Sequence, residues 1–216
     1  MKDPMTSTNR PNTDPEFLLT AFRRLCRLFW GPNAEDCKIL HSGQWFDPFD
    51  AIAVQGGKEG QPLLMAFTEM KAVATASPSP QALCEDLETL YVQTFINNRG
   101  GIAASLYQSS YESGSGSLMG PAAQRMRDRL ASAGLAVSTD RAEPPDHLGI
   151  ELEFLYFLLA EGFDGSPEHL TEAADFAKTE MTPWVTEMRD RLMEAVVIFY
   201  VSAADLLLHL LRRIPR

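Results

Sequence analysis

Apolar residues recur every three or four positions along most of this chain, and that spacing constrains its fold more than any other feature. A run of alternating apolar and polar residues, which would predict a strand, is not found. We therefore expect an all-α protein, a helical bundle of about ten helices. The clearest apolar stripe follows Asp14-Pro15-Glu16, a sequence typical of a helix start, and consists of Leu18, Ala21, Phe22, Leu25, Leu28 and Phe29.

Further helices are expected between proline and glycine breaks. The pattern predicts that Asp146 caps an apolar helix from Leu148 to Ala160, and that one long helix runs from Thr182 to Arg213. The stretch 45–61, which contains Pro48 and a glycine pair, is expected to be a loop. The remaining predicted helices cover residues 34–41, 62–74, 80–96 and 117–133, with one more beginning at Ser166-Pro167. Ser79 is expected to cap the helix at 80–96, and Gly134 to end the helix at 117–133.

Composition suggests four consecutive parts. Residues 1–13 are polar and aperiodic, which predicts a disordered tail. Residues 14–136 form an N-terminal helical part, and residues 148–216 form a C-terminal helical part. The segment 137–147 between them is extended and polar, which favours a hinge.

The charge balance excludes one large class of partner. The chain has 19 basic and 29 acidic residues, a net charge of −10, whereas a nucleic-acid-binding protein needs a basic face. The excess lies in residues 143–190, which contain twelve acidic residues and two basic ones. This window is either a set of solvated helix faces or a surface that meets a cationic partner.

Cysteine usage and hydropathy favour a cytoplasmic protein. The three cysteines are widely spaced and form no CxxC pair, which argues against a disulfide framework or a structural zinc site. Arg23-Arg24 lacks the long apolar segment of an export signal. The apolar stretch 195–211 is short for a membrane span and contains Asp205 and His209, so a buried helix is expected rather than stable membrane insertion.

Motifs for catalysis or cofactor binding are lacking. The chain has no P-loop, no HExxH and no GxSxG sequence, so an enzyme is not expected. His147 and Glu151 lie four residues apart and share a helix face, but two ligands are too few for a typical metal site. These observations leave open a helical regulatory protein that binds a metal or a nucleotide, which is the alternative to the function inferred below.

One short motif resembles a known family. Residues 143–147 (EPPDH), followed by an apolar helix, look like the E-P-x-D-H signature of the TorD/DmsD family of redox-enzyme maturation chaperones. Segments 87–96, 106–120 and 175–200 resemble further parts of the family in the same order. The resemblance covers about residues 14–213 and implies an all-helical fold with two parts joined near the signature.

The resemblance implies a function. Such chaperones are cytoplasmic and non-enzymatic, and they bind the twin-arginine signal peptide of the apo catalytic subunit of a molybdopterin oxidoreductase. They hold back export until the molybdenum cofactor is inserted. Weak GTP binding has been proposed for some members, and no other cofactor is implied. Whether the chain is a monomer or a domain-exchanged dimer is left open.

The resemblance also implies candidate signal-peptide-binding residues. Tyr107 and Tyr111 flank a polar loop and are expected at the surface, whereas the helical spacing of Tyr91 and Phe95 is equally consistent with the core. Thr94 departs from the family pattern, where a leucine is usual, which suggests a different preferred leader. The full set of candidates is Tyr91, Phe95, Tyr107, Tyr111, Glu143, Pro144, Asp146, His147 and, with the weakest resemblance, Trp30.

Overall fold

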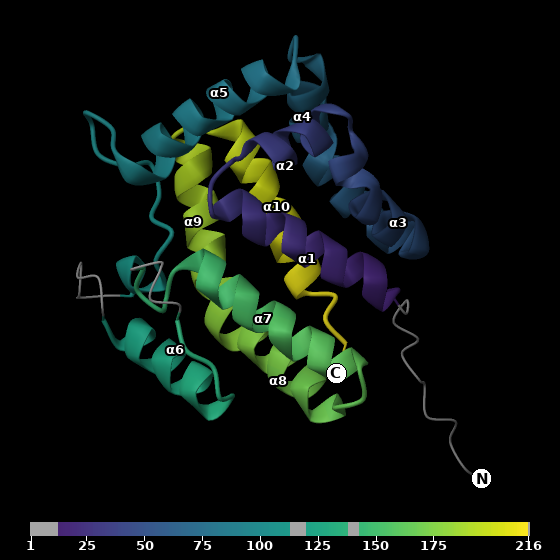
Figure 1. Ribbon diagram of the computed structural model, residues 1–216, viewed down its shortest axis with the longest axis vertical. Helices are drawn as coiled ribbons and strands as arrows, with labels where there is room; N and C mark the ends of the chain where they lie inside the picture. The colour runs from purple at the N-terminus through teal and green to yellow at the C-terminus, as the bar shows by residue number, and fades with distance from the viewer. Residues whose placement is uncertain (1–12, 113–119, 138–142, 216) are drawn as a thin grey trace.

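The computed structural model describes residues 13–112, 120–137 and 143–215, and these ranges fold as an all-α bundle, as expected. Apart from one isolated β-bridge, the described residues contain no β-structure. The predicted tail, but for Thr13, and the predicted start of a helix at Ser117 lie outside the described residues. The α-helices are α1 (Pro15–Phe29), α2 (Ala34–His41), α3 (Asp47–Gln55), α4 (Gln61–Ala76), α5 (Pro80–Tyr91), α6 (Pro121–Ser132), α7 (Leu148–Phe163), α8 (Pro167–Phe176), α9 (Thr182–Glu194) and α10 (Ile198–Leu211) (Figure 1).

Several helix ends are fixed by the residues that the sequence suggests. The Asp14 carboxylate accepts a hydrogen bond from the Glu16 N–H at 2.9 Å and caps α1. The Ser79 hydroxyl accepts one from the Ala82 N–H at 3.1 Å and caps α5. Gly134 follows α6 with φ of +72°, a left-handed conformation that favours glycine. Local capping therefore sets these boundaries before any tertiary packing is considered.

Helix α10 forms the centre of the bundle. Eleven of its 14 residues are buried, and it packs against α4, α9 and α1. Such all-round burial is typical of an interior helix. Within the described ranges, no helix combines the length and the apolarity needed to cross a membrane.

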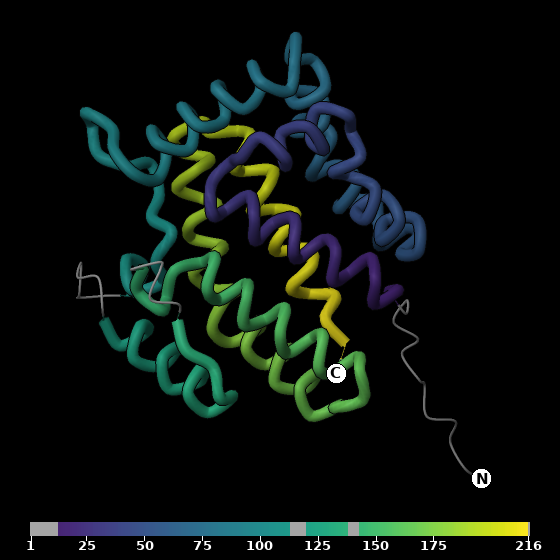
Figure 2. Tube along the Cα trace, in the orientation of Figure 1, coloured from purple at the N-terminus to yellow at the C-terminus, as the bar shows by residue number. Residues whose placement is uncertain are grey.

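Helix α1 joins segments that are distant in sequence. It packs against α7, α3 and α10, and α7 packs in turn against α8 (Figure 2). The buried apolar side chains from both ends of the chain belong to one hydrophobic cluster. The division into residues 14–136, 137–147 and 148–216 remains a prediction, and its two helical parts meet across α1.

The predicted loop over residues 45–61 is wrong. This stretch contains α3, preceded by a 3₁₀ turn at Gln44–Phe46 and followed by another at Gly57–Gly60. Trp45, Phe49 and Ile52 are buried at helical spacing, and Pro48 lies in the first turn of α3, where a missing N–H is tolerated. The glycine pair ends the helix instead of extending a loop.

The predicted long helix from Thr182 to Arg213 is also wrong, because the chain turns between α9 and α10. Val196 adopts φ of +58°, in the left-handed region that β-branched residues rarely enter. The N–H of Val197 donates to the carbonyl of Leu192 at 2.9 Å and closes the turn. Apolar spacing continues through this break, so periodicity alone did not reveal it.

Two π-helical segments adjust the register between helices. Val92–Ile96 extends α5, and Ala177–Met181 joins α8 to α9. In the second segment the Thr182 hydroxyl donates to the Ala177 carbonyl at 2.7 Å, just before Pro183, which has no N–H to donate. The π turn therefore lets the chain pass a proline without leaving the helical path.

Candidate functional site

A row of aromatic rings lies between the end of α1 and the start of α7. The His147 imidazole stacks on the Trp30 indole, with ring centroids 4.5 Å apart and an interplanar angle of 20°. Tyr107 meets His147 edge-on, with ring centroids 5.2 Å apart. We call Tyr107, His147 and Trp30 the aromatic row.

A carboxylate lies at each end of the aromatic row. The Tyr107 hydroxyl donates to Glu143 Oε2 at 2.6 Å, and the Trp30 indole N–H donates to Glu153 Oε1 at 2.9 Å. Burial and the hydrogen bond to Glu143 raise the pKa of Tyr107, so this hydroxyl keeps its proton and remains a donor. The row is therefore fixed at both ends by charge-assisted hydrogen bonds.

Gly149 makes room for the Trp30 indole. A Cβ at position 149 would lie 2.3 Å from Trp30 Cε2 and 2.6 Å from Nε1, closer than any real contact. The indole therefore lies directly against the backbone of the first turn of α7. This close approach explains why a glycine is needed in an otherwise apolar helix.

Asp146 is not the N-cap of α7, contrary to the sequence-based expectation. His147 occupies that position, and its Nδ1 accepts a hydrogen bond from the Gly149 N–H at 3.0 Å. Asp146 is fully buried, and its Oδ2 accepts from the Ser109 N–H at 2.9 Å. The Leu148 N–H donates to the Leu106 carbonyl, which brings the loop that contains Ser109 alongside the start of α7. The Asp146 carboxylate then holds this loop in place.

Tyr111 is half-buried like Tyr107, but its side chain is held by contacts within the fold. Its hydroxyl accepts from the Ser105 N–H at 2.9 Å and donates to the Ser105 carbonyl at 2.7 Å. Its ring packs on Trp184 at 5.5 Å, and the guanidinium of Arg191 lies 4.4 Å from the ring centroid. Tyr111 therefore anchors the loop to α9, whereas Tyr107 belongs to the aromatic row.

Tyr91 and Phe95 belong to a second aromatic cluster around Tyr200 of α10. Phe95 is buried and meets Tyr200 edge-on at 4.8 Å, which supports its interpretation as a core residue. Tyr91 is half-buried, and its hydroxyl donates to the Phe29 carbonyl at 3.1 Å. Burial raises the pKa of Tyr91 to about 12, with a smaller contribution from the charge of Glu143. Tyr91 thus lies between the core cluster and the aromatic row.

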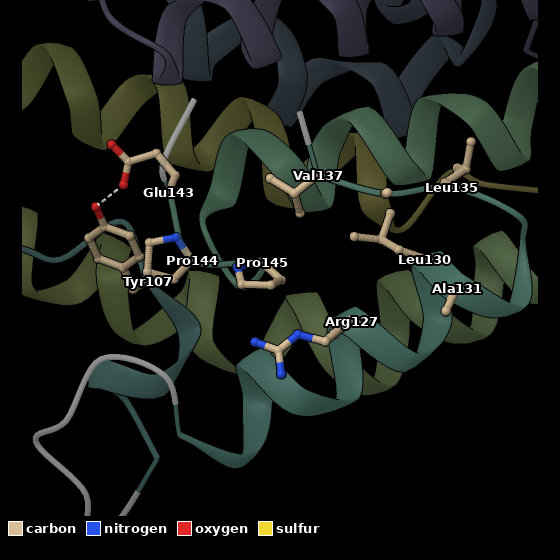
Figure 3. Close-up of a pocket in the computed structure, with 10 residues that line it drawn as sticks. Tyr107, Arg127, Leu130, Ala131, Leu135, Val137, Glu143, Pro144 and Pro145 are labelled. Carbon is tan, nitrogen blue, oxygen red and sulfur yellow. Dashed lines mark hydrogen bonds between the residues drawn. The ribbon is translucent and has the colours of Figure 1, made fainter. Parts of the chain in front are cut away.

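An open hollow of about 780 Å³ lies beside Glu143 and Tyr107. One wall is formed by Pro144 and its proline neighbour, and the opposite wall by α6 and the segment that follows it, with Leu130 and Val137 facing the space (Figure 3). The lining is mostly apolar, with Glu143 near one side and the guanidinium of Arg127 near the other (Figure 3).

Two further hollows continue from the first. The second, of about 290 Å³, shares Leu130 and Val137 with the first and adds Phe157 and Trp30. The third, of about 740 Å³, shares Trp30 and Glu153 with the second. Neighbouring hollows have lining residues in common, so the three lie next to one another, and Tyr107 and Trp30 of the aromatic row line them. We call the three adjoining hollows the groove. We define the groove by Tyr107, Glu143, Pro144, Leu130, Val137, Phe157, Trp30 and Glu153.

Glu151 lies behind this groove and is fully buried. Its Oε2 accepts from the Trp184 indole N–H at 3.1 Å, and its Oε1 has no hydrogen-bond partner. Burial, together with the charge of Asp146, raises the pKa of Glu151 well above its usual value. His147 and Glu151 thus point to different partners, and the described part of the chain holds no group of three His, Cys, Asp or Glu side chains arranged for a metal.

Sequence reasoning missed the far wall of the groove. Leu130, Val137 and Phe157 resemble ordinary core residues at helical spacing, and nothing local shows that they border a space. Glu153 is exposed on α7 and gave no signal either. Only the packing of α6 and α7 beside the segment 143–147 brings these residues together.

Comparison with known proteins gives consistent matches. A family model described as nitrate reductase delta subunit matches residues 59–190. The chaperone protein TorD of Vibrio parahaemolyticus is 31% identical over 108 residues, which cover 47% of this chain and only 50% of that protein. The chaperone protein TorD of Ferrimonas balearica is 27% identical over 199 residues, which cover 86% of this chain and 85% of that protein.

A solved structure from Archaeoglobus fulgidus, described as a redox enzyme maturation protein, matches with a TM-score of 0.48 and 20% identity, covering 95% of this chain and 94% of that one. The family match covers more than half of the chain, including the aromatic row except for Trp30. The relatives are named as chaperones, which is a non-enzymatic role. The chain belongs to the family of nitrate reductase delta subunits and TorD proteins, the redox-enzyme maturation chaperones.

Proposed function

We propose that the groove binds the twin-arginine signal peptide of a molybdenum-cofactor oxidoreductase. In this proposal the chain acts in the cytoplasm on the apo catalytic subunit, and it holds back export until the cofactor is inserted. The observation that carries the proposal is a groove of adjoining, mostly apolar hollows beside the aromatic row, which has a carboxylate at each end.

The apolar part of the groove suits the hydrophobic segment of a leader. An amphipathic helix binds by placing its apolar face in such a groove. Leu130 and Val137 line one side, and Phe157 and Trp30 continue the surface. Aromatic rings that are already held by hydrogen bonds bury large areas at little entropic cost, so the aromatic row is preorganised for binding.

The acidic groups suit the arginine pair. Glu143 and Glu153 both border the groove, and a guanidinium forms strong hydrogen bonds with carboxylates. Arg127 lies in the same hollow as Glu143 and opposes a cationic ligand. Removing the charge of Glu143 should therefore weaken binding, whereas removing the charge of Arg127 should not.

Isothermal titration with a synthetic leader tests the proposal. The peptides are twin-arginine leaders of molybdopterin oxidoreductases from the same organism, and a version of each with both arginines replaced by alanine is its control. We expect Phe157→Ser and Glu143→Gln each to weaken binding about tenfold, equivalent to about 1.4 kcal/mol. Arg127→Gln should leave affinity unchanged or increase it.

Val73→Ser on α4 is the matched control for Phe157→Ser, because Val73 is exposed and does not line the groove. Its affinity should equal that of the wild-type protein. The proposal fails if no heat is detected with any of these leaders. It fails equally if Phe157→Ser and Glu143→Gln, shown by thermal melts to be folded, bind as tightly as Val73→Ser.

A further inference from the structure

The carboxylate of Glu180 lies at the centre of a cluster of polar side chains. It is carried by the π-helical segment Ala177–Met181, and its side chain is 19% exposed. Its Oε2 accepts from Arg125 Nε at 3.2 Å, and its Oε1 accepts from the Arg129 guanidinium at 3.3 Å. The side-chain amide of Gln108 donates to Oε2 at 3.4 Å. One carboxylate therefore contacts side chains from two other parts of the fold.

The two arginines belong to the wall of the groove that α6 forms. Arg125 and Arg129 lie four residues apart on α6, so they share one face of the helix. Arg127 and Leu130 of the same helix line the hollow of about 780 Å³ (Figure 3). The ion pairs of Glu180 with the two guanidinium groups therefore fix where these lining side chains lie.

Gln108 supports the other wall of the same hollow. It is buried, and its backbone N–H donates to the Asp146 carbonyl at 3.0 Å. Asp146 directly follows Pro144 and its proline neighbour, which form that wall. Glu180 is thus connected to one wall through the arginines of α6 and to the other through Gln108.

Apolar burial contributes little to the position of α6. Only four of its 12 residues are buried, and two of these are alanines, whereas eleven of the 14 residues of α10 are buried. Among the described elements, α6 packs chiefly against the 3₁₀ turn Gln108–Ser110. Because small side chains bury little apolar area, the position of α6 depends strongly on its polar contacts.

Glu180 keeps its charge at neutral pH. Burial by itself would raise the pKa of Glu180, but the charge of Arg125, the hydrogen bond from Gln108 and the charge of Arg129 outweigh this effect, so the pKa is lowered. Salt screens partly buried ion pairs much less than exposed ones. The attachment of α6 therefore persists under ordinary solution conditions.

We propose that Glu180 is a positioning residue that sets the distance between the two walls of this hollow, and with it the size of the apolar side chains that the hollow accepts. Glu180 does not line the hollow itself and acts through Arg125, Arg129 and Gln108. Its place on a π-helical turn is consistent with this role, because such turns frequently occur at functional sites. The inference rests on the proposed function, since the accepted side chains are those of a leader.

Hydrogen exchange of the free full-length protein tests the positioning without any ligand. In Glu180→Gln the charge is lost, and the amide presents an N–H₂ group to one of the guanidinium groups, which then lacks its acceptor. We expect the amides of α6 to exchange about tenfold faster, with those of α10 unchanged. Glu168→Gln, at an exposed position on α8, is the control for the lost charge and should match the wild-type protein. Exchange of α6 at the wild-type rate in Glu180→Gln would overturn the proposal.

Leader selectivity tests the consequence for the groove. A twin-arginine leader is compared with a version in which the leucines of its apolar segment are replaced by phenylalanine. We expect the wild-type protein to bind the leucine version more tightly, and Glu180→Gln to reduce the ratio of the two dissociation constants about threefold or more, because a wall that is held less firmly yields to larger side chains. A residue that only stabilised the fold would leave this ratio unchanged.

Glu180→Asp provides a milder variant that keeps the charge on a side chain one methylene shorter. It should lie between the wild-type protein and Glu180→Gln in both measurements, and thermal melts verify that each variant is folded. If the wild-type protein binds neither leader, the proposed function fails. If it binds them and both variants show the wild-type ratio, the role of Glu180 alone is overturned.

Discussion

Glu151 is a carboxyl group buried without full hydrogen bonding, and it makes stability depend on pH. Its pKa is raised in the folded state, chiefly by burial and then by the charge of Asp146. The folded state therefore holds a proton that the unfolded state releases, so stability falls as pH rises from the unfolded pKa towards the folded one. Only below the unfolded pKa is the full stability present.

Glu151→Gln should remove this dependence, because an amide keeps the Trp184 contact without a charge. We expect the variant to be more stable than the wild-type protein at pH 8, with the difference shrinking towards pH 4. Urea denaturation across that range measures the free energy of unfolding. Glu69→Gln, at an exposed position on α4, is the control and should follow the wild-type curve. Parallel curves for Glu151→Gln and wild type would contradict the argument.

Gly149→Ala tests the close contact with Trp30. The added Cβ meets the indole at 2.3 Å, so the ring must move or α7 must shift. We expect a loss of about 1–3 kcal/mol, typical of overpacking, together with weaker leader binding. Chemical denaturation and titration measure the two effects. Gly100→Ala, where an added Cβ would meet nothing within 4 Å, should change neither, and equal behaviour of the two variants would refute the steric argument.

At the residue scale, the sequence predicts a side chain's role where that role is local, and fails where a tertiary contact competes for the side chain. Asp14 and Ser79 were identified as caps because capping is local. Asp146 was assigned the same role and instead bonds the Ser109 N–H, because the cap of α7 is His147. The choice between two adjacent polar residues depends on which backbone lies alongside, and that is decided by tertiary structure.

At the scale of elements, the turn between α9 and α10 carries the clearest strain in the described backbone. Val196 has φ of +58° and is 72% exposed, so few contacts compensate for its conformation. A left-handed conformation costs an L-residue about 1–2 kcal/mol, which glycine avoids at some cost in entropy. The turn is therefore a place where a smaller residue should improve stability.

Val196→Gly is expected to stabilise the protein by about 0.5–1 kcal/mol. The midpoint of urea denaturation should rise without a change in slope. Val73→Gly, an exposed position within α4, is the matched control and should lose a few tenths of a kcal/mol through lower helix propensity. A lower midpoint for Val196→Gly would show that its side chain contributes more than the strain costs.

Element positions were largely predictable, but their interruptions were not. Periodicity located α1, α2, α5 and α7 because each has a buried face and a local cap or stop. It placed a loop where α3 lies and a continuous helix where α9 and α10 are separate. A proline in the first turn of a helix and a left-handed turn without glycine are both hard to recognise in a single sequence.

At the scale of the whole molecule, the acidic window of residues 143–190 is partly used within the fold. Glu151 bonds Trp184, and Glu180 forms ion pairs with Arg125 and Arg129 of α6. Glu143 and Glu153 remain at the groove, where each also accepts a hydrogen bond from an aromatic partner. The window thus attaches α6 to the bundle as well as placing negative charge at the site.

A cationic leader should therefore associate at a salt-dependent rate. We expect the association rate constant to fall several-fold between about 0.02 M and about 0.5 M salt, because screening shortens the range of attraction. Stopped-flow measurement gives the rates. Glu143→Gln should have a smaller salt dependence, and Glu69→Gln, far from the groove in sequence and on α4, should match the wild-type protein. A rate that does not change with salt would mean that the acidic window of residues 143–190 has only a structural role.

The groove is the part of the molecule that could not be predicted from a single sequence. The E-P-x-D-H resemblance identified one wall, including Glu143 and Pro144, whereas His147 of the same motif is buried behind it. The other wall depends on how α6 lies against the bundle, which the ion pairs to Glu180 help to fix. Such contacts join residues more than 50 positions apart and leave no periodic trace.

The position of Trp30 gives the protein an intrinsic optical reporter. Of the three tryptophans, Trp45 and Trp184 are buried, whereas half-buried Trp30 borders the groove and stacks on His147. Excitation of indole fluorescence should therefore report occupancy of the groove through this one side chain against a constant background from the other two. A label-free emission titration then becomes available for screening leaders of different sequence.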